Sequence, residues 1–352
     1  MAYKLFYIED LESDSRKADL ENLGFIVEQY DPERDINNVV DKINTYKPDI
    51  IIMDYRLNSG KETVYYDAPT IAATLRNKHR SNFTEIPIIL ISNESKIADF
   101  YKDFLNQDLF DYAIEKQVLN DDKTYFKSKV LSYLNSYNSI RENNFDILKI
   151  LGLNTEDTTL LHSLILKKLG PKTKQVYEYS RFINDNLIYA IGPIIGEDVL
   201  ASRLGVDKDS KDWGKLLEEF DVFKYRGIFS DAHNRWWAEK IEWWWTNNFG
   251  SNNLRRLNAS ERVSNLTNRF GYDLKAADKT KLSKSTKYWT ICKGTNKPLD
   301  PFDGIQIVKK DYKQWQEKEY FSKDYALEKI DSQKDYIDET DLGYLKELGR
   351  KL

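Results

Sequence analysis

Short apolar runs alternate with amphipathic stretches along the first 138 residues. Five runs rich in β-branched and aromatic residues have the length of buried strands: KLFYIED, FIVEQYD, DIIIMD, IPIILIS and LFDYAIEK. Each is followed by a stretch with helical spacing: DSRKADLENLG, which Gly24 closes, INNVVDKINTYK, APTIAATLRNKHR, KIADFYKDFLNQ and DKTYFKSKVLSYLNSYNSIREN. This order predicts a doubly wound α/β domain over residues 1–138, with five parallel strands joined by right-handed crossovers.

The alternation stops near residue 140. Residues 139–352 are predicted to form a second, mostly helical, Trp-rich α+β domain, in which GIQIV is a strand. The segment HNRWWAEKIEWWWTNNFG is its most unusual part: helical spacing would place His233, Trp237, Ile241 and Trp244 on one stripe, with Gly250 as the stop. We interpret it as a core helix, and the alternative is a stacking platform for a base or a peptide.

Composition narrows the functions that need to be considered. The 352 residues are 41% apolar, which suits two domains with sizeable cores. One cysteine, Cys292, excludes an intramolecular disulfide and is expected to be a small buried residue, and three histidines argue against a zinc cage. Residues 1–138 carry 17 Lys and Arg against 24 Asp and Glu, and the remainder carries 36 against 33. Neither part has the basic balance of a nucleic-acid-binding domain.

Polar residues stand where the predicted strands end. Glu9 and Asp10 end the first strand, Asp54 the third, Ser92 the fourth and Lys116 the fifth. Ligands of open α/β sheets bind at this edge, and three carboxylates gathered there would repel each other without a cation among them. An oxygen-rich pocket suits Mg²⁺, and a lysine with a hydroxyl donor completes a receptacle for a phosphoryl group.

These five residues, each at a strand end and in this order, resemble the receiver domain of two-component response regulators of the chemotaxis-regulator type. The resemblance covers residues 1–138 and implies a flavodoxin-like fold. It also implies Asp54 as phosphoacceptor, Glu9 and Asp10 as Mg²⁺ ligands together with Asp54, Ser92 as a phosphoryl-binding hydroxyl, and Lys116 as the ion-pair partner of the phosphoryl group.

Among several departures from the family, one concerns the output mechanism. Ala113 stands three residues before Lys116, where an aromatic switch residue is common, and Tyr112 is expected to point to the other face of its strand. An aromatic-switch output is therefore not expected.

The first hypothesis is a cytoplasmic phospho-acceptor signalling protein without a DNA-binding output. The resemblance implies a histidine kinase as phosphodonor, and an effector protein and a second copy of the chain are further partners to consider. Neither a membrane nor nucleic acid is expected, because no apolar run of ~18 residues and no basic domain is present. The layout of a receiver before a large Trp-rich region is also similar to proteins of bacterial antiphage signalling systems of the Detocs type, which implies a phosphate sink or relay in defence.

Two other hypotheses stay open. The C-terminal region would be a receiver-controlled enzyme if Asp231, His233 and Arg235 formed a site. It would be an atypical transcriptional regulator if SNNLRRLNASERVSNLTNRFG were a basic helix whose arginines, Arg255, Arg256, Arg262 and Arg269, met phosphates.

A third histidine-bearing segment, TTLLHSLILKKLG, is predicted to be a helix in which His162 is packed or half-exposed.

Overall fold

The computed structural model describes residues 2–10, 14–57, 64–78, 85–93, 109–170, 174–250, 253–308 and 310–351. The chain forms two compact units. The first contains residues 1–150 and 169–182, and the second contains residues 151–168 and 183–352. The predicted boundary at residue 138 falls inside a continuous helix, α7. The helix predicted over KIADFYKDFLNQ lies outside the described residues. No helix in the described ranges is long and apolar enough to cross a membrane.

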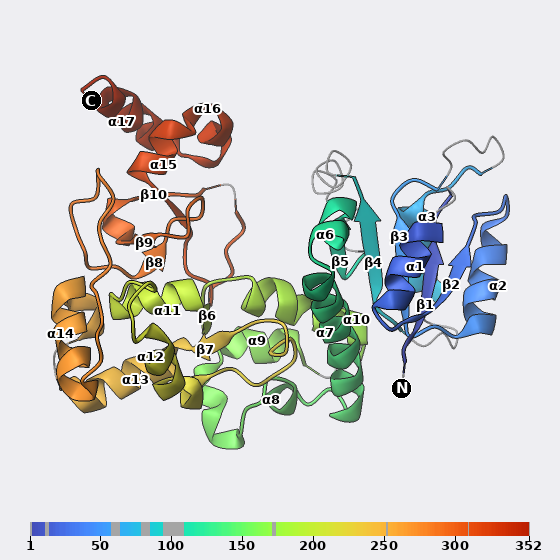
Figure 1. The fold of residues 1–352 in the computed structure, drawn as a ribbon, viewed down its shortest axis with the longest axis horizontal. Helices are drawn as coiled ribbons and strands as arrows, with labels where there is room; N and C mark the ends of the chain where they lie inside the picture. The colour runs from blue at the N-terminus through green and yellow to red at the C-terminus, as the bar shows by residue number, and fades with distance from the viewer. Residues whose placement is uncertain are drawn as a thin grey trace. The chain divides into compact units, whose positions relative to one another are not determined.

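The first unit is built on a parallel sheet with the strand order β2-β1-β3-β4-β5 (Figure 1). Its strands are β1 (Lys4–Ile8), β2 (Ile26–Tyr30), β3 (Ile50–Asp54), β4 (Ile88–Ser92) and β5 (Tyr112–Glu115). All four pairings are parallel. This order is that of flavodoxin-like doubly wound folds, and it confirms the predicted fold class for the first part of the chain.

Helices cover both faces of this sheet: α2 (Ile36–Tyr46) and α3 (Ala68–Lys78) pack on one face, and α1 (Asp14–Asn22), α6 (Lys116–Asp121) and α7 (Lys123–Glu142) pack on the other. The first unit also contains α8 (Ile147–Ile150) and most of α10 (Val176–Ile183). The short helix α6 was not predicted, because the sequence pattern runs from the fifth strand directly into α7.

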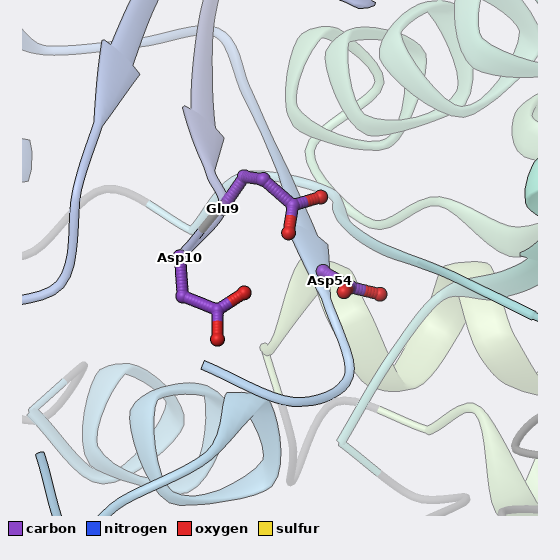
Figure 2. A group of neighbouring side chains, drawn as sticks. All are labelled: Glu9, Asp10 and Asp54. Carbon is purple, nitrogen blue, oxygen red and sulfur yellow. The ribbon is translucent and has the colours of Figure 1, made fainter. Parts of the chain in front are cut away.

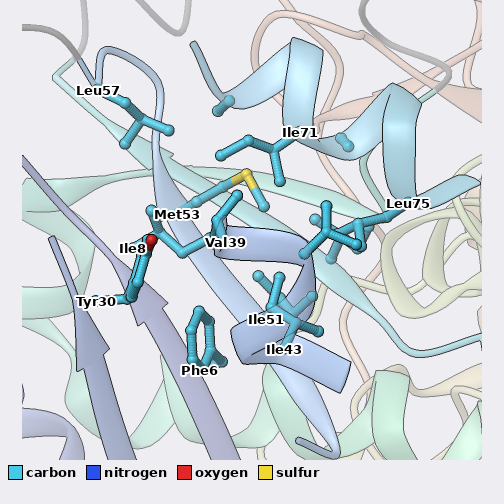
Figure 3. Close-up of a cluster of buried hydrophobic side chains, with 14 of the residues drawn as sticks. Phe6, Ile8, Tyr30, Val39, Ile43, Ile51, Met53, Leu57, Ile71 and Leu75 are labelled. Carbon is cyan, nitrogen blue, oxygen red and sulfur yellow. The ribbon is translucent and has the colours of Figure 1, made fainter. Parts of the chain in front are cut away.

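Strand alternation sends successive side chains to opposite faces, which explains why the strands are apolar throughout. Phe6 and Met53 face α2 and α3 in a buried cluster, which Figure 3 shows. Leu5 and Ile52 face the opposite cluster, to which α1, α6 and α7 contribute. Because both faces are buried, a one-residue slip in register would still bury apolar residues but would move the polar strand ends.

A buried polar network holds α10 against the first unit. Asp111, which precedes β5, accepts hydrogen bonds from Arg76 Nη2 and from the Tyr137 hydroxyl, both at 2.7 Å. The Arg76 guanidinium also stacks 3.7 Å from the ring centroid of Tyr177 in α10. Because Tyr177 completes the environment of a buried cation, residues 169–182 group with the first unit although they follow it in sequence.

The second unit is rich in helices and has small two-stranded sheets. Its helices include α9 (Ser163–Lys168), α11 (Glu197–Leu204), α12 (Trp213–Glu219), α13 (Ala238–Phe249), α14 (Ala259–Phe270), α15 (Lys323–Glu328), α16 (Ile330–Gln333) and α17 (Glu339–Gly349), with shorter turns η2 (Thr155–Leu160), η3 (Asn184–Ile188), η4 (Asp221–Phe223), η5 (Leu254–Arg256), η6 (Pro301–Asp303) and η7 (Lys334–Tyr336). The antiparallel pairs are β6 (Ile194–Gly196) with β7 (Arg235–Trp237), β8 (Thr290–Ile291) with β9 (Pro298–Leu299), and β10 (Gly304–Gln306) with β11 (Tyr320–Ser322).

The tryptophan segment differs in part from its prediction. Residues 235–237 form strand β7, and the helix begins only at Ala238, so the expected stripe from His233 to Trp244 is wrong. The cause is the pairing of Trp236 and Trp237 with β6, about 40 residues earlier. The core role is confirmed, because Trp245 is fully buried in the main cluster of this unit, and Gly250 ends the helix as predicted.

Candidate functional site

The carboxyl edge of the five-stranded sheet gathers the five polar residues that the sequence singles out. Glu9 and Asp10 follow the last residue of β1, and Asp54 and Ser92 are the last residues of β3 and β4. Lys116 follows β5 directly and is the first residue of α6. Because parallel strands end at a common edge, residues more than 100 positions apart in the sequence meet here.

Three carboxylates converge at this edge (Figure 2). Glu9, Asp10 and Asp54 each place one oxygen within 4.8 Å of the other two, and all three residues are less than a tenth exposed. Ionised carboxylates this close repel each other strongly in a poorly solvated site. The pKa of Glu9 is accordingly raised from 4.5 to about 7, first because the carboxyl is buried and second because Asp54 lies beside it.

Lys116 links two of these acids. Its Nζ donates to Glu9 Oε2 at 3.0 Å and lies 3.0 Å from Asp54 Oδ2. The Tyr7 hydroxyl donates to the same oxygen of Glu9 at 2.9 Å, and the Tyr55 backbone N–H donates to Asp54 Oδ1 at 2.9 Å. Burial opposes the charge on Lys116, but attraction by Asp54 and Glu9 outweighs it and raises the pKa of the lysine. The ammonium group therefore stays charged and offsets part of the repulsion between the acids.

The donor set fits a magnesium ion. Glu9 Oε1 is buried and has no hydrogen-bond partner among the described residues, so it is a lone acceptor that a cation would satisfy. All donors are carboxylate oxygens, the ligands that Mg²⁺ prefers, and this ion keeps waters and phosphoryl oxygens in the rest of its shell. Glu9, Asp10 and Asp54 would hold it, and the ion would neutralise negative charge on a phosphoryl group.

Ser92 lies on the strand next to Asp54. The backbone of Asp54 is paired with that of Ile91, so Ser92 is one residue further toward the carboxyl edge. The serine is almost fully buried, whereas Asn93 after it is exposed. Its role as a phosphoryl-binding hydroxyl remains a prediction.

Ala113, at the usual aromatic-switch position, and Tyr112 before it point to opposite faces of the sheet, as predicted. Ala113 packs against the cluster beneath α2 and α3. Tyr112 packs against the other cluster, and its ring stacks on that of Tyr133 in α7 with centroids 5.9 Å apart. The face that carries Ala113 therefore has only a methyl group at this position.

The strand order gives the first unit a flavodoxin-like fold, and the acidic pocket lies at the carboxyl edge of its sheet. No family model matches the chain, and no curated protein matches it by sequence. Several solved receiver domains are similar in fold to its N-terminal part. One is the signal receiver domain of a putative Luxo repressor protein from Vibrio parahaemolyticus, with 14% identity, 42% of this chain and 98% of that chain covered, and a TM-score of 0.31.

Two further receiver domains are similar at the same level. The BeF3-activated N-terminal receiver domain of Klebsiella pneumoniae RstA has 18% identity, with 37% of this chain and 97% of that chain covered and a TM-score of 0.29. A CheY-like receiver domain from Methylobacillus flagellatus has 16% identity, with 37% and 99% covered and a TM-score of 0.29.

The candidate residues of the second unit do not assemble as one cluster. Asp231 is exposed, whereas His233 is buried and lines a cavity together with Arg235. Tyr189 and Lys208 line the same cavity and were missed, since nothing in their local sequence connects them with residue 233. Of the three residues of the Asp-x-His-x-Arg hypothesis, His233 and Arg235 line this cavity and Asp231 does not.

His162, Cys292 and Arg262 are further residues of this unit that the sequence singles out. His162 lies before helix α9 rather than inside a helix, and its Nδ1 accepts a hydrogen bond from the Leu164 N–H. Cys292 is fully buried, as predicted. Arg262 cannot meet phosphates as the basic-helix hypothesis required, because it is fully buried and its Nη1 donates to backbone carbonyls at the end of α11 and at Tyr288.

Proposed function

We propose that the chain is a cytoplasmic phospho-acceptor signalling protein that receives a phosphoryl group on Asp54 from a partner histidine kinase. The observation that carries this proposal is the position of Asp54, whose carboxylate ends a central strand beside two further acids and 3.0 Å from Lys116 Nζ. An oxygen of the carboxylate forms the new P–O bond while the P–N bond to the donor histidine breaks. Among the described residues, Glu9, Asp10 and Asp54 are the one group of three such side chains whose ligand atoms lie close enough together to hold a metal ion.

Each neighbour of Asp54 has a part in this transfer. The Tyr55 N–H fixes Asp54 Oδ1 and so sets the orientation of the carboxylate. The Lys116 ammonium, already between Asp54 and Glu9, would shift its contact to a phosphoryl oxygen once Asp54 is esterified. Ser92, next along the edge, is the proposed hydroxyl ligand for a second phosphoryl oxygen.

Phosphorylation can be tested with acetyl phosphate and Mg²⁺ followed by Phos-tag electrophoresis. The wild-type chain should give a shifted band, and Asp54→Asn should not. Asp41→Asn is a matched control, because Asp41 is an exposed acid of α2 in the same unit, and it should shift like the wild type. A wild-type band that does not shift, or a shift that persists in Asp54→Asn, would remove the proposal.

We further propose that residues 139–352 do not bind DNA. We also propose that the phosphate on residues 1–138 is either stored or relayed, as the similarity of the layout to antiphage signalling proteins implies. The near balance of charges after residue 138 and the burial of Arg262 support this. An effector protein and a second copy of the chain are the proposed partners of a relay. Hydrogen exchange separates the two roles: unchanged protection of residues 183–352 on phosphorylation indicates a sink, and altered protection indicates a relay.

A receiver-controlled enzyme is the second candidate. The cavity lined by His233 and Arg235 favours an enzymatic function, because a small molecule could bind there in the second unit. A receiver-controlled enzyme requires that phosphorylation change the rate of the reaction it catalyses. A sink or a relay requires no such change.

A further inference from the structure

A cavity of about 350 Å³ lies within the second unit. Its walls come from the end of η3, the start of α11, the segment leading into β7 and the turn after β8, which are more than 100 residues apart in sequence. This volume is that of a site for a metabolite-sized ligand. The lining is unusually polar, with charged side chains of both signs, so a purely apolar ligand would leave them desolvated.

Most of the charges in the cavity are already paired. Lys208 Nζ lies 2.5 Å from Asp198 Oδ1, and Lys293 Nζ lies 3.3 Å from Glu319 Oε1. Glu197 Oε1 accepts a hydrogen bond from the Trp213 indole at 3.0 Å. These groups form a rim that can donate and accept hydrogen bonds but adds little net charge.

Arg235 is the cation that stands apart from this pairing. Among the described residues its guanidinium donates hydrogen bonds to backbone carbonyls: Nε donates to Ile188 O at 2.8 Å, and Nη1 donates to Asn234 O at 3.0 Å. Burial lowers the pKa of Arg235 and outweighs the attraction by Tyr189 and by Asp198, which pairs with Lys208, but an arginine stays protonated at neutral pH. A partly buried cation that forms no ion pair of its own is costly in the free protein, and an anionic ligand would offset that cost.

The guanidinium is held in place before any ligand binds. Arg235 is the register partner of Gly196, and a Cβ atom on Gly196 would stand 3.1 Å from Arg235 Nη1. Because Gly196 has no side chain, the guanidinium can lie close to the backbone of β6. Two carbonyl contacts and a close backbone neighbour limit its rotamers, so little side-chain entropy is lost when it binds a planar or tetrahedral anion.

Aromatic rings stand beside the cation. Tyr189 and His233 both line the cavity and meet edge to face, with centroids 5.0 Å apart. Tyr189 is 45% exposed and therefore has ring surface left for a ligand, whereas His233 is buried. A planar ring of a ligand can stack on this exposed ring surface.

We propose that this cavity binds a small molecule in which a phosphate or carboxylate group is attached to a planar ring, with the anion on Arg235 and the ring against Tyr189. Binding of this ligand requires neither phosphorylation of Asp54 nor catalysis, so it can be tested independently of the proposed function. Hydroxyl or amino groups of the ligand would meet the carboxylates of the rim.

Isothermal titration calorimetry of the full chain tests it with four probes: adenosine 5′-monophosphate, adenosine, benzoate and inorganic phosphate. Mg²⁺ is left out and the titrations are repeated with Asp54→Asn, so that binding at the acidic edge of the first unit is recognised. We expect adenosine 5′-monophosphate or benzoate to bind at least about tenfold more tightly than adenosine and inorganic phosphate. The preferred probe identifies the anion as phosphate or carboxylate.

Variants then assign the site. Arg235→Gln should weaken the preferred probe by about tenfold or more, and Tyr189→Ala should weaken ring-bearing probes but not inorganic phosphate. Arg256→Gln, which changes an exposed arginine of the same unit outside the cavity, should bind like the wild type. Near-UV circular dichroism checks that each variant is folded. If Arg235→Gln does not fold, Tyr189→Ala still tests the site. Absence of saturable binding of either ring-bearing anion at about 5 mM, or full binding by both folded variants, would overturn the proposal.

Discussion

Lys116 Nζ lies 3.0 Å from Asp54 Oδ2, although Asp54 ends β3 and Lys116 follows β5, and these two strands are not neighbours in the sheet. The lysine comes from the end of β5 and reaches past β4 to the acid at the end of β3. It thereby also contacts Glu9 Oε2 at 3.0 Å. One ammonium group thus spans most of the carboxyl edge, and the charge balance of the pocket depends on it.

Magnesium is expected to stabilise the first unit. An ion held by Glu9, Asp10 and Asp54 binds the native chain but not the unfolded one, and at ten times its dissociation constant it adds about 1.4 kcal/mol to the free energy of unfolding. Thermal unfolding followed by far-UV circular dichroism should shift upward at millimolar Mg²⁺. Asp10→Asn should lose most of this shift, while Asp41→Asn should keep it. A wild-type curve that stays in place up to ~10 mM Mg²⁺ would mean that the pocket does not hold the ion.

The stability of the metal-free chain is expected to fall as the pH rises from 4.5 to about 7. The pKa of Glu9 is about 7 in the folded chain against its usual 4.5, so within this window the native state holds a proton that the unfolded state has lost. Protonation favours the folded state, and its contribution is present below pH 4.5 and disappears through pH 7, with a slope of at most about 1.4 kcal/mol per pH unit.

Urea unfolding with a chelator at several pH values measures this slope. Glu9→Gln keeps the size of the side chain and removes its titration, so its difference from the wild type isolates the contribution of Glu9. Mg²⁺ should flatten the slope, since the ion favours the ionised carboxylate. Parallel pH profiles for the wild type and Glu9→Gln would show that this carboxyl titrates normally.

Lys116→Met is expected to destabilise the metal-free chain by about 2 kcal/mol, because it leaves the buried Glu9 and the nearby Asp54 without their shared cation. Lys123→Met is the matched control: Lys123 lies 2.7 Å from Asp19, but both side chains are substantially exposed, so the loss should stay within about 0.5 kcal/mol. Added Mg²⁺ should narrow the difference at residue 116 and leave the control unchanged. Equal losses in the two variants, measured by urea unfolding, would show that Lys116 stabilises the chain no more than an exposed lysine does.

Gly205→Ala should destabilise the second unit more than Gly271→Ala. Both glycines end helices with φ of +71°, where alanine is strained by about 1 kcal/mol. Only at Gly205 would the added Cβ also meet backbone, 2.7 Å from Ala259 Cα, so we expect a total of about 2–4 kcal/mol there. All eight tryptophans lie at or after residue 213, so fluorescence-detected urea unfolding reports this unit. Equal losses would show that α14 can move away from the added methyl group at little cost.

Local sequence alone determined the five-stranded sheet of the first unit, whereas tertiary contacts decided that residues 169–182 belong to this unit. Its strands are runs such as Ile50–Ile52, whose β-branched side chains suit a sheet covered on both faces, and each run ends in a polar residue. Since parallel strands share a carboxyl edge, the pattern was sufficient to bring Asp54, Ser92 and Lys116 to one place. The contacts themselves were not predictable, because the reach of Lys116 past β4 and the burial that raises the pKa of Glu9 arise only when the strands are assembled.

In the second unit, by contrast, tertiary structure overrode local pattern. Helical spacing around Trp236 gave way to strand β7, because pairing with a strand about 40 residues away decides the backbone there. Arg262 has the spacing of an exposed basic helix, yet it is buried where α14 meets the end of α11. The cavity around Arg235 joins segments whose sequences carry no common motif. Periodicity reports only which side of an element faces the core, and distant pairings, buried cations and cavities depend on which elements meet.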